Sequence, residues 1–258
     1  MRIALAQVRA GADIANVVAG AASEGAALVV FPEMFSNGYA GWGDDRDGWF
    51  AAAETVAEGP TVRAFADAAR ANGIHVLGTF LECDGDAFHN TAVIWGPGGP
   101  VLHQRKRHIC FFDAPEEALT AGERSSFADI STAEGPIRVG ILICMDREYP
   151  RPAADLARQS AEVVLVPNAC PLIDAPGVGD VHVAGVRGLA FSHAMALAVC
   201  NYPSGGAGDG RSFWVDARGA IGGMAGSGEK VFMVDMNLEA LRDWREGEWF
   251  RWRAESPK

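Results

Sequence analysis

Short apolar segments rich in β-branched residues alternate with alanine-rich segments along the 258-residue chain. Several apolar segments, such as ALVVF, VGILI and VVLV, are hydrophobic at consecutive positions, which is typical of strands buried on both faces of a sheet. The pattern predicts strands at Arg2–Val8, Ala27–Phe31, Ile74–Leu81, Thr91–Trp95, Val101–His103, Ile137–Ile143, Glu162–Val166, Ser212–Asp216 and Lys230–Asp235.

The alanine-rich segments between these strands predict helices. Asp13 can cap a helix that ends near Gly25, and Thr61 can cap another that runs through Ala71. Two further helices are predicted at Pro152–Ala161 and Val183–Leu197. Strands and helices alternate without a linker long enough to divide domains, which favours one α/β domain over residues 1–258.

Composition and charge narrow the class of protein. The chain has 22 Lys and Arg residues against 33 Asp and Glu residues, so its net charge is −11. Such an acidic chain is not expected to bind nucleic acid or an anionic membrane surface. No apolar run is long enough to span a membrane, and MRIALAQVRAG at the start has no secretory apolar region. We therefore expect a cytoplasmic protein.

The five cysteines, at positions 83, 110, 144, 170 and 200, suggest neither a zinc site nor a disulfide framework. Their number is odd and no two are spaced as CxxC. Free thiols in a reducing compartment fit better, and we expect no metal and no cofactor. Cys110, Cys170 and Cys200 stand in apolar surroundings and are expected to be packing residues.

Several predicted strands end in polar or reactive residues. Glu33, Lys106 and Cys144 each follow an apolar segment, and the carboxyl ends of strands are where α/β sheets gather their chemistry. A carboxylate can take the proton of a thiol, and an ammonium group can stabilise the oxyanion of an attacked carbonyl or nitrile. If these strand ends converge, the three residues can form and hydrolyse an acyl-enzyme.

Four blocks in this order resemble the nitrilase superfamily of carbon–nitrogen hydrolases: VVFPEMF (29–35), RKRHI (105–109), GILICMDREYP (140–150) and VPNAC (166–170). The resemblance covers nearly the whole chain. It implies a four-layer αββα sandwich of the α/β class. It also implies that Glu33 is the general base, Lys106 the stabiliser of the oxyanion and Cys144 the nucleophile. As the nucleophile, Cys144 is expected to react with iodoacetamide faster than the other thiols.

The resemblance also implies a second glutamate between the lysine and cysteine blocks, before a glycine. In DAPEEALTAG (113–122) either Glu116 or Glu117 can fill this role, and we favour Glu116. The chain departs from many members at Gln104, where they carry Tyr, and at Arg151, where they carry Glu.

The substrate is less constrained than the chemistry. Arg147 can hold a substrate carboxylate, as in some N-carbamoyl amino acid hydrolases of the family, or it can pair with Asp146 or Glu148. Asn168, Ala169, Tyr202 and the loop at 171–182 are expected to line the pocket. Because the chain is short for the family, a small amide or ureido substrate is favoured over a nitrile. The alternatives are a nitrilase proper and a non-catalytic binding protein on the same fold.

The segment WREGEWFRWR (244–253) carries three Trp and one Phe near the end of the chain. Such an apolar cluster is expected to be covered, and family members associate through a helical face. We therefore expect a homodimer or higher homo-oligomer in which residues 240–258 cover a neighbouring subunit. Packing onto the same chain is the alternative.

Overall fold

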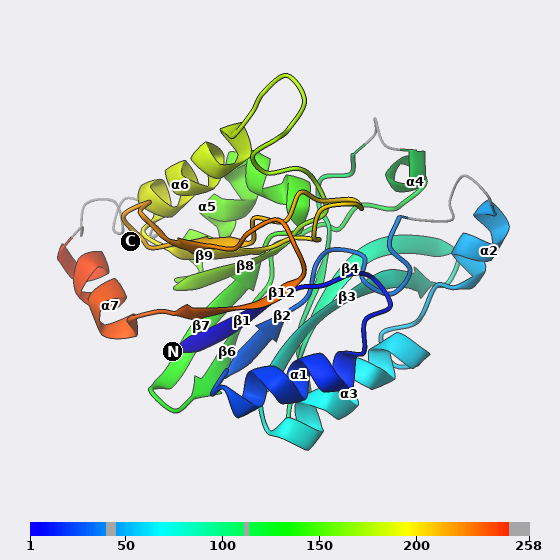
Figure 1. Cartoon of the computed structure of the whole chain (residues 1–258), viewed down its shortest axis with the longest axis horizontal. Helices are drawn as coiled ribbons and strands as arrows, with labels where there is room; N and C mark the ends of the chain where they lie inside the picture. The colour runs from blue at the N-terminus through cyan, green and yellow to red at the C-terminus, as the bar shows by residue number, and fades with distance from the viewer. Residues whose placement is uncertain (40–44, 111–113, 248–258) are drawn as a thin grey trace.

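The computed structural model describes residues 1–39, 45–110 and 114–247. Two six-stranded sheets face each other, and helices cover the outer face of each, which makes a four-layer α/β sandwich (Figure 1). The first sheet has the order β12-β1-β2-β3-β4-β5, and the second has the order β11-β10-β9-β8-β7-β6. The α/β sandwich expected from the sequence is confirmed.

The strands of the first sheet are β1 (Arg2–Gln7), β2 (Leu28–Val30), β3 (His75–Asp84), β4 (Ala87–Gly96), β5 (Gly99–Arg105) and β12 (Lys230–Asp235). Those of the second sheet are β6 (Phe127–Thr132), β7 (Gly135–Ile141), β8 (Val163–Pro167), β9 (Ala196–Cys200), β10 (Phe213–Val215) and β11 (Ile221–Met224). The larger helices are α1 (Ile14–Ser23), α3 (Pro60–Asn72), α5 (Pro150–Arg158), α6 (Val181–His193) and α7 (Leu238–Gly247). Shorter ones are α2 (Arg46–Ala51), α4 (Ala114–Glu117) and the 3₁₀ helix η1 (Cys144–Glu148).

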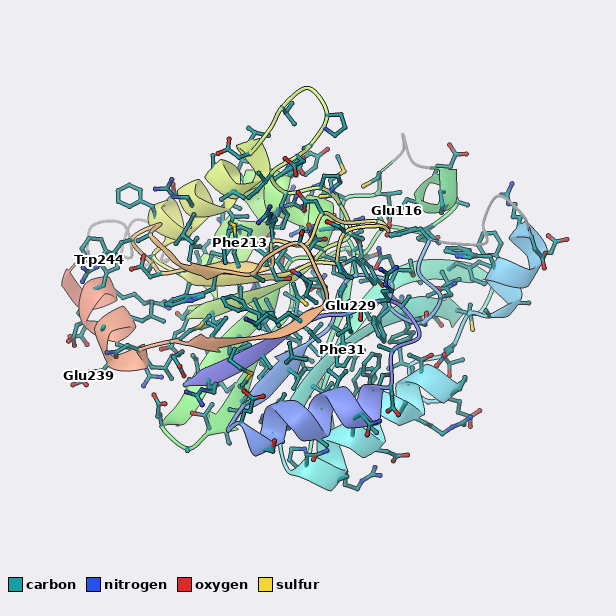
Figure 2. The ribbon with its side chains drawn as sticks, in the orientation of Figure 1. Phe31, Glu116, Phe213, Glu229, Glu239 and Trp244 are labelled. Atoms are coloured by element: carbon teal, nitrogen blue, oxygen red, sulfur yellow. The ribbon has the colours of Figure 1, made fainter. Side chains whose placement is uncertain are left out.

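Three buried apolar clusters hold the four layers together. The central one lies between the sheets and includes Leu5 and Val30 from the first sheet and Leu165 from the second. The two outer clusters join the first sheet to α1 and α3, and the second sheet to α5 and α6. Figure 2 labels one aromatic residue of each outer cluster, Phe31 and Phe213. Both faces of each sheet are therefore buried, which explains the consecutive apolar positions in the sequence.

The start of α1 is capped by a neighbouring residue, whereas the start of α3 is capped by a residue from another segment. Asp13 caps α1 as predicted, because its carboxylate accepts a hydrogen bond from Asn16 N at 3.0 Å. Thr61 does not cap α3, which begins one residue earlier, at Pro60. The carboxylate of Glu54, from the preceding segment, accepts hydrogen bonds from the first turn of this helix instead.

The predicted helix Val183–Leu197 is too long. The helix ends at His193, Ala194 takes a left-handed backbone conformation with φ of 51°, and β9 begins at Ala196. The apolar residues of β9 pair with β8 on one side and β10 on the other, so sheet pairing overrides the helical pattern. Strands β6 and β11 and helices α2, α4 and α7 were not predicted.

The topology brings the carboxyl ends of several strands to one place. β1, β2 and β3 run parallel in the first sheet, and β7, β8 and β9 run parallel in the second. The two sets meet across the sandwich, since Glu33 N donates to Asn168 O at 3.4 Å and the Cys200 thiol donates to Val30 O at 3.0 Å. Residues that follow these strands therefore lie close together.

Helix α7 packs against its own chain. Trp244 Nε1 donates to Ala217 O at 3.2 Å, and the guanidinium of Arg218 lies 4.9 Å from the centre of the indole ring. Figure 2 shows Trp244 at the left end of the molecule and Glu116 above and to the right of its centre. The other aromatic residues of the predicted interface tail, at 249, 250 and 252, lie outside the described residues.

Among the described residues, no helix has the length and apolar character needed to cross a bilayer.

Candidate active site

Four loops that follow strands form one small cavity of about 230 Å³. Glu33 comes after β2, Lys106 directly after β5, Cys144 after β7 and Ala169 after β8. The lining residues are Glu33, Tyr39, Lys106, Cys110, Glu116, Cys144, Met145, Glu148, Ala169, Cys170 and His182. The three residues singled out from strand ends in the sequence therefore share one cavity.

The ammonium group of Lys106 lies between two buried carboxylates. Its Nζ atom donates to Glu33 Oε1 at 2.7 Å and to Glu116 Oε2 at 2.6 Å. All three side chains are only 1% exposed. Glu117 is exposed on the surface, so of the two glutamates left open by the sequence, Glu116 is the one in the cavity.

Two polar residues that the sequence did not suggest hold the carboxylates in place. Asn90 Nδ2 on β4 lies 2.8 Å from Glu33 Oε1 and 2.7 Å from Glu116 Oε1. The hydroxyl of Tyr39 donates to Glu116 Oε1 at 2.8 Å. A single asparagine at the start of the apolar segment TAVIW was the available signal for Asn90.

The surroundings push the pKa values of the two glutamates in opposite directions. Burial, together with the nearby Cys144 and Glu116, raises the pKa of Glu33 well above its usual range, although Lys106 opposes this. Burial by itself would also raise the pKa of Glu116. The Lys106 charge and the hydrogen bonds from Lys106, Asn90 and Tyr39 outweigh that effect and lower it. Glu116 therefore stays ionised, whereas Glu33 can carry a proton closer to neutral pH.

Lys106 stays protonated in this setting. Burial by itself would lower the pKa of its ammonium group, but the negative charges of the neighbouring Glu33 and Glu116 raise it well above its usual value. A fixed positive charge therefore lies in the wall of the cavity.

Cys144 stands at a strained turn. Its φ of 43° lies in the left-handed region, which residues other than glycine seldom adopt. Asp146 stabilises the turn, since its carboxylate accepts hydrogen bonds from Ile143 N at 3.1 Å, Arg107 N at 3.0 Å and His108 N at 2.8 Å. Asp146 thereby ties the cysteine turn to the loop that carries Lys106.

The Cys144 thiol is protonated in the free protein. A hydrogen bond to Cys170 and burial raise the pKa of Cys144 well above its usual value, although Lys106 and Arg147 oppose this. Because a thiol is a weak nucleophile, any attack by Cys144 on a substrate would need a base. Glu33 lines the same cavity, and its raised pKa makes its carboxylate a suitable acceptor for the thiol proton.

Arg147 is buried behind the cysteine turn, with 3% of its surface exposed. Its Nη2 atom lies 3.4 Å from Glu148 Oε1, and its terminal nitrogens also contact the sulfurs of Cys144 and Cys170. Asp146, the other partner considered from the sequence, is occupied by Arg107 and His108. Arg147 does not line the cavity, so its expected contact with a substrate stays a prediction.

Some of the residues expected to line the pocket do line the cavity, and others lie outside it. Ala169 lines the cavity, and from the 171–182 loop only His182 does so. Asn168 is fully buried behind the wall, where its amide donates to Asn201 Oδ1 at 3.0 Å. Tyr202 lines a neighbouring cavity of about 470 Å³ that shares Tyr39 with the first. Asn168 and Tyr202 therefore lie outside the wall around Cys144, and their contact with a substrate stays a prediction.

Two cysteines expected to be packing residues lie in the cavity instead. Cys110 and Cys170 both line it, and both are half-buried. Cys200 is fully buried in the central cluster, as expected of a packing residue. Apolar neighbours in sequence did not reveal the polar side chains that the fold brings to Cys110 and Cys170.

Among the described residues, no group of three or more His, Cys, Asp or Glu side chains is placed to hold a metal ion.

Comparison with known proteins identifies the family. The sequence model of the carbon-nitrogen hydrolase family matches residues 10–246. The chain therefore belongs to the carbon–nitrogen hydrolases and is an enzyme of the amidase-like branch of the nitrilase superfamily.

Several characterised proteins are similar to it. An (R)-stereoselective amidase from Pseudomonas sp is 28% identical over 83% of this chain and 74% of its own length. The omega-amidase NIT2 of Danio rerio is 27% identical over 90% of this chain and 83% of its own length. A nitrilase from Pyrococcus abyssi is 34% identical, but the match spans 62% of this chain and 59% of the nitrilase.

The fold has a solved counterpart. The crystal structure of Nit3 from Saccharomyces cerevisiae, a member of branch 10 of the nitrilase superfamily, superposes with a TM-score of 0.78 at 25% identity. The superposition covers 96% of this chain and 94% of Nit3.

Proposed function

We propose that this enzyme hydrolyses the C–N bond of a small carboxamide or N-carbamoyl compound through a thioester on Cys144. The observation that carries the proposal is the buried group formed by Glu33, Lys106 and Glu116 in the same cavity as the Cys144 thiol. The amidase and omega-amidase relatives support an amide bond as the one that is cleaved.

In the first half-reaction, Cys144 Sγ attacks the carbonyl carbon of the substrate while its proton passes to Glu33. The carbonyl oxygen becomes an oxyanion, and the ammonium group of Lys106 stabilises that charge. Collapse of the tetrahedral intermediate breaks the C–N bond, and Glu33 returns the proton to the departing nitrogen. Ammonia or an amine leaves, and the acyl group stays on the sulfur as a thioester.

In the second half-reaction, Glu33 takes a proton from a water molecule that attacks the thioester carbonyl. The C–S bond then breaks, Cys144 regains its proton and the acid is released. Glu116 keeps Lys106 charged and oriented through both steps, because it remains ionised at 2.6 Å from Nζ.

The size of the cavity limits the substrate. A cavity of about 230 Å³ lies below the roughly 300–1,000 Å³ typical of sites for drug-sized ligands. We therefore expect small acyl groups. Arg147 would contact a substrate carboxylate only if it turned toward the cavity, and N-carbamoyl amino acids test this directly.

The test is ammonia release from three sets of small compounds: carboxamides, N-carbamoyl amino acids and nitriles. We expect turnover of a carboxamide or an N-carbamoyl compound, none by Cys144→Ala, and a thioester adduct on Cys144 by mass spectrometry of acid-quenched enzyme. Cys83→Ala is the matched control, because Cys83 lies on β3 outside the cavity, and it should retain activity. Turnover of nitriles alone, or full activity in Cys144→Ala, would contradict the proposal.

A further inference from the structure

One guanidinium group contacts two sulfur atoms beside the cavity. Arg147 Nη1 donates to Cys144 Sγ at 3.6 Å, and Nη2 donates to Cys170 Sγ at 3.3 Å. The sulfurs of Cys144 and Cys170 therefore lie against the two terminal nitrogens of the same guanidinium group. The proposed hydrolysis uses only Cys144, so a second sulfur with no part in that reaction stands next to the nucleophile.

Cys170 has the surroundings of a thiolate. Asn168 Nδ2 lies 3.4 Å from its sulfur, in addition to the contacts from Arg147 and Cys144. The hydrogen bond from Cys144, the Arg147 charge and the Asn168 contact lower the pKa of Cys170 to about 6, although burial opposes this. Because Cys170 is half-buried and lines the cavity, a small molecule that enters can reach it.

The two cysteines are poised differently for oxidation. The lowered pKa of Cys170, about 6, favours its thiolate, and thiolates rather than thiols react with peroxides. Cys144 is the neighbouring thiol, on the same guanidinium group. The two residues lie on the loops that follow β7 and β8, which are adjacent parallel strands. A disulfide needs the sulfurs at about 2.05 Å, so these loops, rather than the sheet, must accommodate the approach.

We propose that Cys170 is a redox-modification site: a hydroperoxide that enters the cavity oxidises Cys170, and Cys144 then closes a reversible disulfide that stops hydrolysis. The proposal goes beyond the proposed function, because the disulfide can be mapped without any substrate.

The atoms and electrons balance in two steps. The Cys170 thiolate attacks the terminal oxygen of the hydroperoxide, the O–O bond breaks and Cys170 becomes a sulfenic acid. The hydroxide or alkoxide that leaves takes a proton from solvent and departs as water or an alcohol. The Cys144 sulfur then attacks the sulfenic sulfur, the S–O bond breaks and a second molecule of water leaves with the Cys144 proton. Two thiols are oxidised to one disulfide, and the hydroperoxide is reduced.

Cys110 provides a matched comparison in the same cavity. Its sulfur lies 3.6 Å from Lys106 Nζ and 3.2 Å from Met145 Sδ, away from Arg147. Burial raises the pKa of Cys110 above its usual value despite Lys106, so it stays a thiol. We therefore expect Cys110 to take no part in the disulfide.

The experiment treats the reduced full-length enzyme, Cys170→Ala and Cys110→Ala with hydrogen peroxide. Activity is followed relative to each untreated protein, intact mass is measured, and a non-reducing peptide map locates the bonds. For the wild type and Cys110→Ala we expect loss of activity, loss of two hydrogen atoms in mass, a Cys144–Cys170 peptide pair and full recovery with dithiothreitol.

For Cys170→Ala we expect inactivation through sulfinic or sulfonic acid at Cys144, which gains two or three oxygen atoms and does not recover with dithiothreitol. A Cys144–Cys110 pair, no pair at all in the wild type, or equal recovery in Cys170→Ala would overturn the proposal. The peptide map reads out these results even if no tested compound proves to be a substrate.

Discussion

Glu33 and Glu116 contact the same ammonium group, yet the protein gives the two carboxylates different properties. Both receive hydrogen bonds from Lys106 and Asn90, but Glu33 is fully buried beside Cys144 and Glu116, whereas Glu116 receives a further hydrogen bond from Tyr39. The difference is set by neighbours that come from separate strands and loops. At the residue scale, environment rather than residue type therefore separates the carboxylate with a raised pKa from the one whose pKa is lowered.

The pH profile of the wild-type enzyme tests the assignment of Glu33 as base. The carboxylate must be ionised to take the Cys144 proton, and its pKa is raised. We expect kcat/KM to fall as the pH decreases through that raised value, with a midpoint above the value of about 4.3 for an ordinary glutamate. A midpoint at or below 4.3 would exclude Glu33, in this environment, as the group that titrates.

Replacement of Glu116 tests its role beside Lys106. In Glu116→Gln the negative charge that raises the pKa of Glu33 is gone, so the acidic limb of kcat/KM should move to lower pH. We also expect kcat to fall by about 100-fold or more, because Lys106 loses the partner that orients it toward the oxyanion.

Glu117→Gln is the matched control for this variant, since Glu117 is the adjacent residue and is exposed. Its rate and pH profile should equal those of the wild type. A limb that moves to higher pH in Glu116→Gln, or a large loss in Glu117→Gln, would contradict the assignment.

The order in which the cysteines are alkylated tests which of them, Cys144 or Cys170, is the thiolate in the free enzyme. The sequence led us to expect Cys144 to react with iodoacetamide fastest, but in the free enzyme Cys170 has the lower pKa, about 6, and Cys144 has a raised one. We now expect Cys170 to be the first of the five thiols to be labelled at pH 7. Timed labelling followed by peptide mass spectrometry measures the order. Labelling of Cys144 before Cys170 would show that the thiolate resides on the nucleophile instead.

At the element scale, helix α3 depends on a residue outside it. Glu54 is buried, and its carboxylate accepts hydrogen bonds from Thr61 N at 3.1 Å and Val62 N at 2.9 Å. These backbone groups have no partner within the helix, and a carboxylate also interacts favourably with the positive end of the helix dipole. The first turn of α3 is thus held by Glu54, a residue of the segment that pairs with β3.

Truncation of this capping residue should destabilise the protein. We expect Glu54→Ala to lower the free energy of unfolding by about 1–2 kcal/mol, because two backbone donors lose their acceptor. Urea denaturation followed by circular dichroism measures the change. Glu58→Ala, four residues along and exposed, should be nearly neutral. Equal effects of the two substitutions would show that the cap does not stabilise α3.

At the scale of the whole molecule, the site exists because two sheets pack face to face. Glu33 and Lys106 follow strands of the first sheet, and Cys144 follows a strand of the second. The central apolar cluster sets the separation of the sheets, and the bond from Glu33 N to Asn168 O joins their strand ends. Stability of the sandwich and geometry of the site therefore share the same core.

A cavity in this central cluster should be costly. Leu165 on β8 is fully buried between the sheets, so Leu165→Ala is expected to lower the free energy of unfolding by about 2–5 kcal/mol. Val101→Ala, on the exposed side of edge strand β5, should change it by less than about 0.5 kcal/mol. Urea denaturation of both variants measures the difference, and similar values would argue against a tightly packed interface between the sheets.

Much of the fold could be predicted because local patterns and burial agree. The consecutive apolar positions of Val163–Val166 and the cap at Asp13 each specify their element through nearby residues alone. The end of α6 could not be predicted, because residues 196–200 favour a strand only when β8 and β10 lie on either side. The cap of α3 could not be predicted either. Its acceptor is the carboxylate of Glu54, and the position of Glu54 depends on the pairing of its segment with β3.

The sequence by itself was enough to single out Glu33, Lys106 and Cys144, since each follows an apolar strand segment and stands in a motif that resembles those of the family. It also restricted the second glutamate to Glu116 or Glu117. Only the tertiary structure decided which of these two faces Lys106, which cysteines share the cavity, and which of those cysteines lie against Arg147. The physical reason is that a pKa and a contact depend on distance and burial, and both are set by segments far apart in the chain.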